Sequence, residues 1–129
     1  MPSFSKPKIL VLEDHPATLD AIKMIFEFEG YEVMDLYHTI DLHSKIVAFK
    51  PDVILIDIIL SVTDGRAICK ELKLSVHAAI PILLMSSRNG IHNKNNNQCH
   101  WDDFIEKPFE METILNKVST LISKKAKQT

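Results

Sequence analysis

The chain has 129 residues, of which 46% are hydrophobic and 25% are charged, and its formal net charge is −2. This size and composition are typical of one globular domain, and the charge gives no basis for a nucleic-acid-binding surface. No apolar stretch reaches the roughly 18 residues that a membrane span requires, and the first residues lack the apolar segment of a signal peptide, so we expect a cytoplasmic protein without membrane contact.

One domain followed by a short basic end is predicted. We place the domain at residues 6–123, and we expect residues 124–129, which contain three lysines, to form a tail or the start of a linker. The two cysteines, Cys69 and Cys99, lie far apart without CxxC spacing, which favours reduced thiols. Reduced thiols agree with the expected cytoplasmic location.

A strand, a helix and a second strand are predicted first. Residues 8–12 form an apolar run of strand length, and Pro16 suits the first position of a helix. Apolar residues then recur at helical spacing until Gly30, which favours the end of the helix. Residues 31–36 are predicted as the second strand.

The middle of the chain continues this alternation. A helix is predicted from about residue 39 to residue 49, and Pro51 ends it. Residues 53–57 are predicted as the third strand, and their continuous apolar character indicates burial on both faces of a parallel sheet. Asp64 suits the N-cap of the next helix, and residues 81–85 are predicted as the fourth strand.

A short fifth strand at residues 103–106 precedes the final helix. The apolar residues of this helix lie on one helical face. They are Ile114, Leu115, Val118, Leu121 and Ile122. Strands that alternate with helices predict an α/β fold, in which helices cover both faces of a parallel sheet.

Asp57 stands out because it interrupts the most apolar segment of the chain. An ionised carboxylate buried without a partner costs several kcal/mol, so Asp57 requires either solvent or a cation. Polar residues also follow other strands: Glu13 and Asp14 follow the first, Ser86 the fourth and Lys107 the fifth. Because ligands of open α/β sheets bind beyond the carboxyl ends of the strands, we expect these side chains to converge on one pocket.

The predicted pocket has the groups that phosphoryl chemistry requires. Crowded carboxylates repel one another unless a cation lies among them, and a site of oxygen ligands favours Mg²⁺. Lys107 adds a positive charge, and Ser86 adds a hydroxyl donor. With these groups a carboxylate can accept a phosphoryl group, because phosphoryl transfer depends mainly on positioning and charge neutralisation.

The polar motifs form an ordered series along the chain. They are Glu13-Asp14, Asp57, Gly65, Ser86 and Lys107-Pro108-Phe109. At these spacings the chain resembles the receiver domains of two-component response regulators, and the resemblance extends over residues 8–122. It implies a flavodoxin-like, doubly wound five-stranded sheet with strand order 2-1-3-4-5, and this order comes from the resemblance, not from the spacing.

The resemblance implies that Asp57 accepts a phosphoryl group from a phosphohistidine of a sensor histidine kinase or phosphotransfer protein. Asp14, Asp57 and the backbone carbonyl of Ile59 are expected to ligate Mg²⁺, while Glu13 acts on the metal through water. Such a domain catalyses only its own phosphorylation and dephosphorylation, so we do not expect a conventional enzyme.

Further roles follow from the same resemblance. Lys107 is expected to contact the phosphoryl oxygens, and its peptide bond to Pro108 is expected to be cis. Ser86 is expected to hydrogen-bond the phosphoryl group in the active state, and Phe104 to be the switch aromatic that moves inward as that hydroxyl shifts. The added charge of about two units at Asp57 is the event that biases the two states.

The chain departs from the family pattern at residues 89–100. This segment is rich in Asn and lacks the apolar stripe that docks a helix, so we expect the family's fourth helix to be short, displaced or mobile. Trp101 is expected to cover apolar surface in its place. The downstream partner therefore cannot be inferred by analogy, and association with a second copy of the chain remains open.

Two residues are expected to set the lifetime of the phosphorylated state. Ile59 should hinder water, and Arg88 should pair with phosphate oxygens. A haloacid-dehalogenase-type phosphatase would require an aspartate in place of Ile59, and a flavodoxin relative would require a phosphate-binding loop in place of the acidic pair after the first strand. A receiver-like interaction module that is not phosphorylated remains the alternative.

Overall fold

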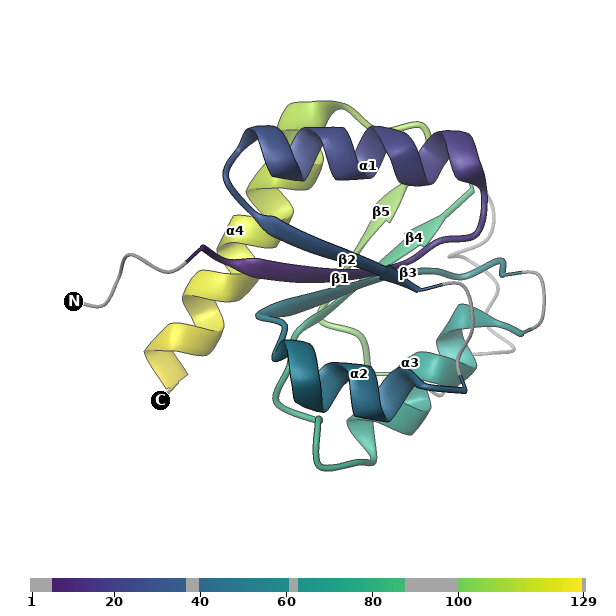
Figure 1. Ribbon diagram of the computed structural model, residues 1–129, viewed down its shortest axis with the longest axis vertical. Helices are drawn as coiled ribbons and strands as arrows, with labels where there is room; N and C mark the ends of the chain where they lie inside the picture. Colours follow the sequence, from purple (N-terminus) through teal and green to yellow (C-terminus); the bar gives the residue numbers. More distant parts are fainter. Residues whose placement is uncertain (1–5, 37–39, 61–62, 88–99, 129) are drawn as a thin grey trace.

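Figure 1 shows the computed structural model of the chain, which describes residues 6–36, 40–60, 63–87 and 100–128. These residues form one sheet of five parallel strands in the order β2-β1-β3-β4-β5. The strands are β1 (Lys8–Leu12), β2 (Glu32–Leu36), β3 (Val53–Asp57), β4 (Ile82–Ser86) and β5 (Asp103–Glu106). The predicted flavodoxin-like sheet and its strand order are confirmed.

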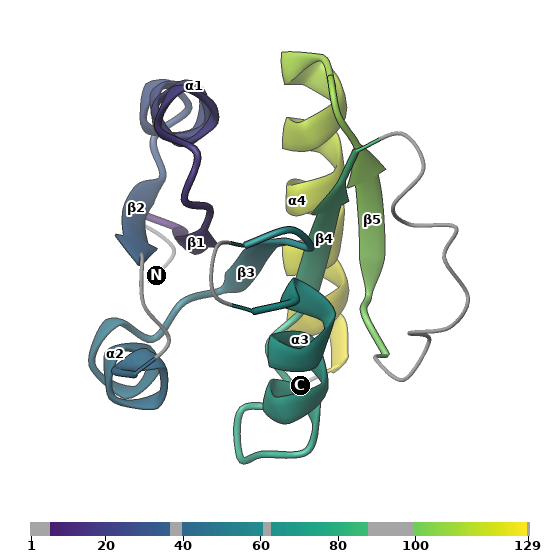
Figure 2. The ribbon, with the colours of Figure 1, turned by 90° about the vertical axis from the view of Figure 1, so that its right-hand side faces the viewer.

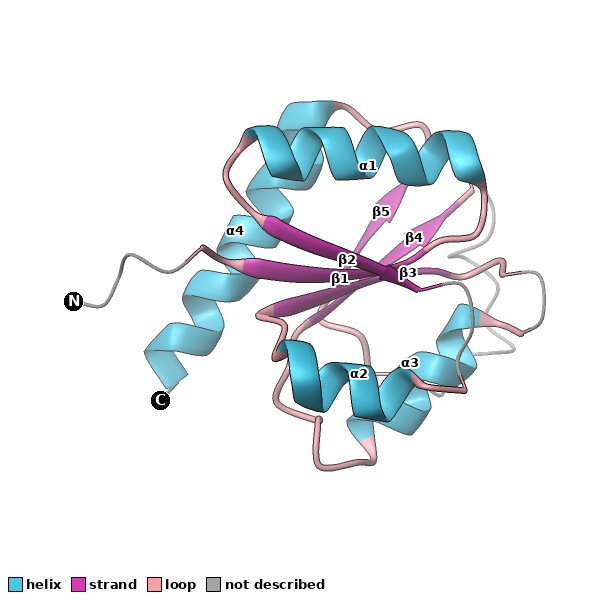
Figure 3. Cartoon of the chain, viewed as in Figure 1, coloured by secondary structure: helices cyan, strands magenta, loops and turns pink. Residues whose placement is uncertain are grey.

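In the part of the chain that the structure describes, four helices cover the sheet. They are α1 (Pro16–Phe28), α2 (Leu42–Phe49), α3 (Gly65–Lys73) and α4 (Met111–Gln128). Figures 1 and 3 show α1 and α4 on one face of the sheet and α2 and α3 on the other, and Figure 2 shows the same layers from the side. Among the described residues, no helix is long and apolar enough to cross a membrane.

Each face of the sheet has its own apolar core because alternate residues of a strand point in opposite directions. In β1, Ile9 and Val11 pack beneath α1 and α4, whereas Leu10 and Leu12 pack beneath α2 and α3. All five residues of β3 are buried. The continuous apolar run in the sequence therefore does reflect a central strand covered on both faces.

Local signals in the sequence mark most helix ends. Pro16 begins α1, and Gly30 adopts a φ of 93° just after α1 ends. Asp64 caps α3 by accepting a hydrogen bond of 2.8 Å from the backbone N–H of Arg66, as predicted. α2 begins at Leu42, later than predicted, and ends with Lys50 in the left-handed region. Strand boundaries agree with the prediction to within one residue.

Three further expectations concern the edges of the domain. Trp101 is half-buried and packs against the core beneath α2 and α3, whereas its expected role in place of the fourth helix stays a prediction. The expected irregular fourth helix at residues 89–100 lies almost entirely outside the described residues. Cys69 is buried and disulfide-bonded, so the prediction of reduced thiols is wrong for this residue.

Candidate functional site

Polar residues from three strands meet at the carboxyl edge of the sheet. Glu13 and Asp14 follow β1, Asp57 ends β3, and Lys107 follows β5. Because the strands are parallel, their ends lie at the same edge, and a cavity of about 340 Å³ opens there. The cavity is lined by Glu13, Asp14, His15, Asp57, Ile59, Leu60, Ser87 and Lys107. The predicted convergence therefore occurs for both acidic residues after β1, for Asp57 and for Lys107.

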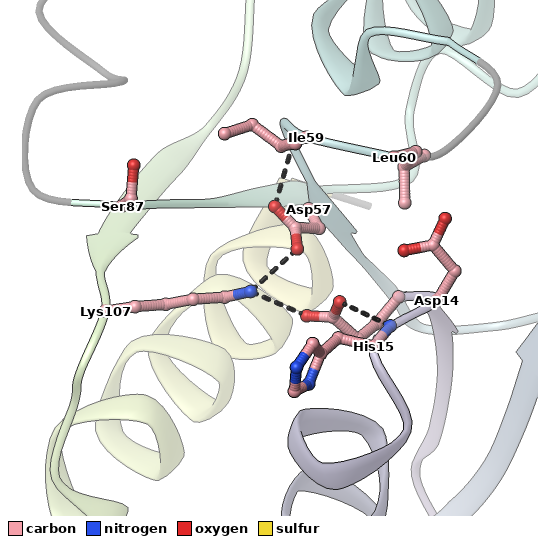
Figure 4. Close-up of a pocket in the computed structure, with 8 residues that line it drawn as sticks. Asp14, His15, Asp57, Ile59, Leu60, Ser87 and Lys107 are labelled. Carbon is pink, nitrogen blue, oxygen red and sulfur yellow. Dashed lines mark hydrogen bonds and ion pairs between the residues drawn. The ribbon is translucent and has the colours of Figure 1, made fainter.

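Lys107 connects two of the carboxylates. Its ammonium donates a hydrogen bond of 2.7 Å to Oδ2 of Asp57 and one of 2.8 Å to Oε1 of Glu13. Figure 4 shows the lysine side chain pointing toward Asp57, with Asp14 to one side of both. The positive charge explains how Asp57 can stand in an apolar strand, because a buried carboxylate requires a charged partner.

Backbone N–H groups bind the other oxygen of each carboxylate. The N–H of Ile59 donates to Oδ1 of Asp57 at 3.0 Å, and the N–H of His15 donates to Oε2 of Glu13 at 3.1 Å. Glu13 has no exposed surface and Asp57 is 5% exposed. Both carboxylates are therefore held by two donors each, which fixes their orientation.

Burial and charge shift the pKa values of the connected groups. Burial raises the pKa of the Glu13 carboxyl, and the neighbouring Asp57 raises it further, although the hydrogen bond from Lys107 opposes both effects. Burial alone would lower the pKa of Lys107, but its hydrogen bonds to Asp57 and Glu13 outweigh burial and raise it. Lys107 therefore stays protonated between the carboxylates.

The connection from β3 to α3 passes close to Asp57. A Cβ atom at Gly65 would overlap the backbone carbonyl oxygen of Asp57, so this position requires glycine. The N–H of Gly65 donates to the carbonyl of Ile58 at 2.7 Å, and Ile59 pairs with Asp64 in an isolated antiparallel bridge. These contacts explain the physical need for glycine in the sequence motif.

Ser86 and Phe104 are not among the residues that line this cavity. Ser86 is buried, and its hydroxyl donates to the carbonyl of Ser87 at 2.7 Å. Phe104 is 38% exposed on the edge strand β5. The peptide bond between Lys107 and Pro108 is cis, as expected. Arg88, the second residue expected to set the phosphoryl lifetime, lies outside the described residues.

The carboxylates that line the cavity supply some of the oxygen ligands that a hard cation such as Mg²⁺ requires. Glu13, Asp14 and Asp57 line the same cavity. Lys107 and one backbone N–H already bind each of Glu13 and Asp57. Within the described part of the chain, no three His, Cys, Asp or Glu side chains form a ready metal site. Mg²⁺ does not require three carboxylates, because it is commonly bound by one or two together with water.

The cavity also includes residues that sequence reasoning did not select. Ser87 lines it, although the motif pointed to Ser86. Ser86 ends β4 and Ser87 follows it, and two adjacent serines give no signal for which hydroxyl faces the cavity. Leu60 and His15 also line it, and the ring of His15 accepts or donates a hydrogen bond of 3.3 Å with Thr18 in the first turn of α1.

The chain is similar to known proteins over most of its length. A family profile described as response regulator receiver domain matches residues 9–119. The DNA-binding dual master transcriptional regulator RpaA of Synechocystis sp. is 31% identical over 118 residues, which cover 90% of this chain and 49% of that protein. The response regulator MprA of Mycobacterium avium is 26% identical over 116 residues, which cover 89% of this chain and 50% of that protein. This chain spans about half the length of the curated relatives it matches.

Solved structures show the same fold. A CheY-like response regulator receiver domain protein from Methanospirillum hungatei superposes with a TM-score of 0.85 and 25% identity, covering 97% of this chain and 100% of that one. The receiver domain of a sensor histidine kinase from Pseudomonas aeruginosa superposes with a TM-score of 0.81 and 22% identity, covering 92% and 99%. The latter is described with a magnesium ion coordinated in its active site cleft.

Proposed function

This chain belongs to the response regulator receiver domain family, and from that premise we propose that Asp57 is the residue that accepts the phosphoryl group. The observation that carries the proposal is the contact of 2.7 Å between Lys107 and Asp57, in a cavity that Asp14 shares. A carboxylate nucleophile beside a fixed cation, open to solvent at one edge, is the arrangement that phosphoryl acceptance requires.

The transfer forms one bond and breaks one. A carboxylate oxygen of Asp57 attacks the phosphorus of a phosphohistidine, and the bond between phosphorus and the imidazole nitrogen breaks, with the electron pair staying on the nitrogen. Asp57 has no proton to lose because it reacts as the ionised carboxylate that Lys107 stabilises. The chain therefore contributes the nucleophile and its orientation, while the donor contributes the leaving group.

Mg²⁺ is the cofactor that the site would hold. We propose Asp14, Asp57 and the backbone carbonyl of Ile59 as its ligands, with Glu13 acting through water. When bound, the ion would neutralise the negative charge that builds up on the phosphoryl oxygens. Lys107 donates hydrogen bonds to Glu13 and Asp57, and Asp14 lines the same cavity.

Lys107 is also proposed to bind the phosphoryl group after transfer. In the unphosphorylated chain its ammonium is shared between Glu13 and Asp57. After transfer, the phosphoryl oxygens carry more negative charge than the carboxylate did, so the ammonium is expected to turn toward them. Ser86 is expected to exchange its hydrogen bond to the carbonyl of Ser87 for one to the phosphoryl group, and Phe104 to move inward.

The biological role is that of a signalling domain. We propose a sensor histidine kinase or phosphotransfer protein as the donor, and the downstream partner is unknown. We propose residues 6–123 as the receiver domain and residues 124–129 as a basic tail or the start of a linker. The helix α4 continues through Gln128, so most of this tail is helical. Catalysis is limited to the domain's own phosphorylation and dephosphorylation.

Uptake of a small phosphodonor tests the proposal. The chain is incubated with acetyl phosphate and Mg²⁺, and its intact mass is measured beside that of Asp57→Asn. The native chain should gain one phosphoryl group and the variant none. If the native chain gains none under conditions in which a known receiver domain is labelled, the chain acts as an interaction module that is not phosphorylated.

A further inference from the structure

Phe104 lies at the open edge of the sheet, where β5 is the outer strand. Phe104 is paired in register with Leu84 of β4, so these two side chains lie on the same face of the sheet. Ser86 lies two residues after Leu84 on β4 and therefore shares that face. The next residue, Ile105, belongs to the opposite face and packs in the core that α4 covers. Figure 2 shows α4 alongside β4 and β5.

Lys117 of α4 reaches this edge from the opposite face. Its ammonium lies 5.9 Å from the centroid of the Phe104 ring and 3.3 Å from Oδ2 of Asp103. Val118, the next residue of α4, is fully buried, which anchors the helix beneath the sheet. One ammonium therefore contacts the aromatic ring of β5 and also the carboxylate that precedes it.

We propose that Lys117 is a positioning residue that holds the Phe104 ring at the outer edge of β5 in the unphosphorylated chain. A lysine ammonium is attracted to the face of an aromatic ring. The ion pair with Asp103 directs the flexible lysine side chain to this place, because Asp103 lies on the same side of β5 as α4. The proposal rests on the proposed function of Asp57, since it concerns the conformational change that phosphorylation drives.

Inward movement of the ring would require loss of the contact with Lys117. In the unphosphorylated chain the Ser86 hydroxyl donates its hydrogen bond to the carbonyl of Ser87. A phosphoryl group, or beryllofluoride as its mimic, favours the inward state. The apparent affinity for the mimic is lower when a larger fraction of molecules has the ring outward. Lys117 therefore raises the threshold at which phosphorylation switches the domain.

Nuclear magnetic resonance of isotope-labelled phenylalanine tests the proposal. The Phe104 ring signal is assigned with Phe104→Leu and followed in the native chain, in Lys117→Met and in Lys117→Arg, each with and without Asp57→Asn. Lys124→Met, on the exposed part of α4, is the matched control. Beryllofluoride with Mg²⁺ is titrated as the phosphoryl mimic into the forms that retain Asp57.

Lys117→Met should raise the inward population of Phe104 about two- to tenfold without any phosphodonor, the range for one partly exposed cation–aromatic contact. The beryllofluoride midpoint should fall by the same factor. Lys117→Arg and Lys124→Met should match the native chain, because arginine keeps the cation and Lys124 lies elsewhere on α4.

Two results would overturn the role of Lys117. One is an unchanged Phe104 signal in Lys117→Met, even if its melting temperature falls, because that pattern belongs to a purely structural lysine. The other is an equal shift in Lys124→Met. Failure of the native chain to bind beryllofluoride would instead count against Asp57 as acceptor, and the ring signal in the Asp57→Asn forms would still test Lys117.

Discussion

Lys107 and Asp57 are separated by 50 positions in the chain, yet the ammonium of one lies 2.7 Å from a carboxylate oxygen of the other. The parallel sheet creates this contact because β3 and β5 end at the same edge. Glu13, from the end of β1, shares the same ammonium at 2.8 Å. Three strands are thus joined by one cation at the place where we propose that a phosphoryl group is received.

Gly65→Ala should disturb the site through the backbone. The new Cβ would overlap the carbonyl of Asp57, so we expect a loss of about 1–3 kcal/mol in the free energy of unfolding, together with slower labelling by acetyl phosphate. Urea unfolding and intact mass measure the two effects.

Gly30→Ala is the control for this change. Its φ of 93° disfavours alanine, but no atom lies within 4 Å of the new Cβ, and the position is remote from Asp57. It should lose about 1 kcal/mol of stability and keep the native labelling rate. Equal labelling rates in both variants would contradict the proposed close contact between Gly65 and the acceptor.

Ile59→Asn should shorten the lifetime of the phosphorylated state. The Ile59 side chain stands at the mouth of the cavity and is 64% exposed, so an amide in its place would admit and orient water near the phosphoryl group. The decay rate should rise at least several-fold, and more when Arg88→Glu is added, as followed by intact mass after removal of donor.

The exposed Val76, in the connection between α3 and β4, provides the comparison. Val76→Asn makes the same apolar-to-amide change away from the cavity, and it should decay at the native rate. Identical decay in Ile59→Asn and Val76→Asn would remove the proposed role of Ile59.

Asp64→Asn should lower the free energy of unfolding at neutral pH but not in acid. Burial would raise the pKa of the Asp64 carboxyl, but its hydrogen bonds and charge contact with Arg66 outweigh burial and lower it below the usual 3.8. A carboxyl with a lowered folded pKa adds stability that is present above 3.8 and is lost as pH falls through the folded pKa. Asparagine keeps the cap but lacks this charge.

The difference between native chain and Asp64→Asn should therefore be under about 1 kcal/mol at neutral pH, because the pair is partly exposed, and should vanish in acid. Urea midpoints across pH 2 to 7 measure it. Asp41→Asn is the matched control, since Asp41 precedes α2 without forming a side-chain cap. A difference that persists at the acid end would contradict the ionic origin.

Lys73→Met should destabilise the domain without touching the site. The Lys73 ammonium donates to the carbonyls of Ala78 and Ile80, both at 3.1 Å, and to Asp102 at 2.8 Å. Removing it leaves these acceptors without the donor, which we expect to lower the free energy of unfolding by about 1–3 kcal/mol.

Lys70→Met, on the same helix but exposed, should change stability by less than about 0.5 kcal/mol. Both variants should be labelled by acetyl phosphate to the native extent. A Lys73→Met chain as stable as Lys70→Met would show that water replaces the lysine at no free-energy penalty.

Much of the fold was predictable because its signals are local. The continuous apolar run of β3 indicated burial on both faces, and Asp64 and Gly30 marked helix ends by their own backbone preferences. Strand ends then brought Glu13, Asp14, Asp57 and Lys107 to one edge. Parallel geometry alone predicts that much, whereas the strand order came from the resemblance to receiver domains.

Other features depend on side-chain orientation, which sequence patterns do not encode. Ser87, not Ser86, lines the cavity, and Lys117 reaches around β5 to Phe104 from the opposite face. The disulfide bond of Cys69 was missed because spacing does not report distance in the fold. Such features determine which side chains line the cavity and which residues contact Phe104 at the edge of the sheet.

Reductive trapping is the most direct measurement of the central claim. Sodium borohydride converts an aspartyl phosphate to homoserine, and peptide mass spectrometry then locates the modified residue. After treatment with a phosphodonor and Mg²⁺, we predict homoserine at residue 57 and a strong decrease when Lys107→Met is substituted. Homoserine at a different aspartate, or none in a chain that has gained a phosphoryl group, would contradict Asp57 as the acceptor.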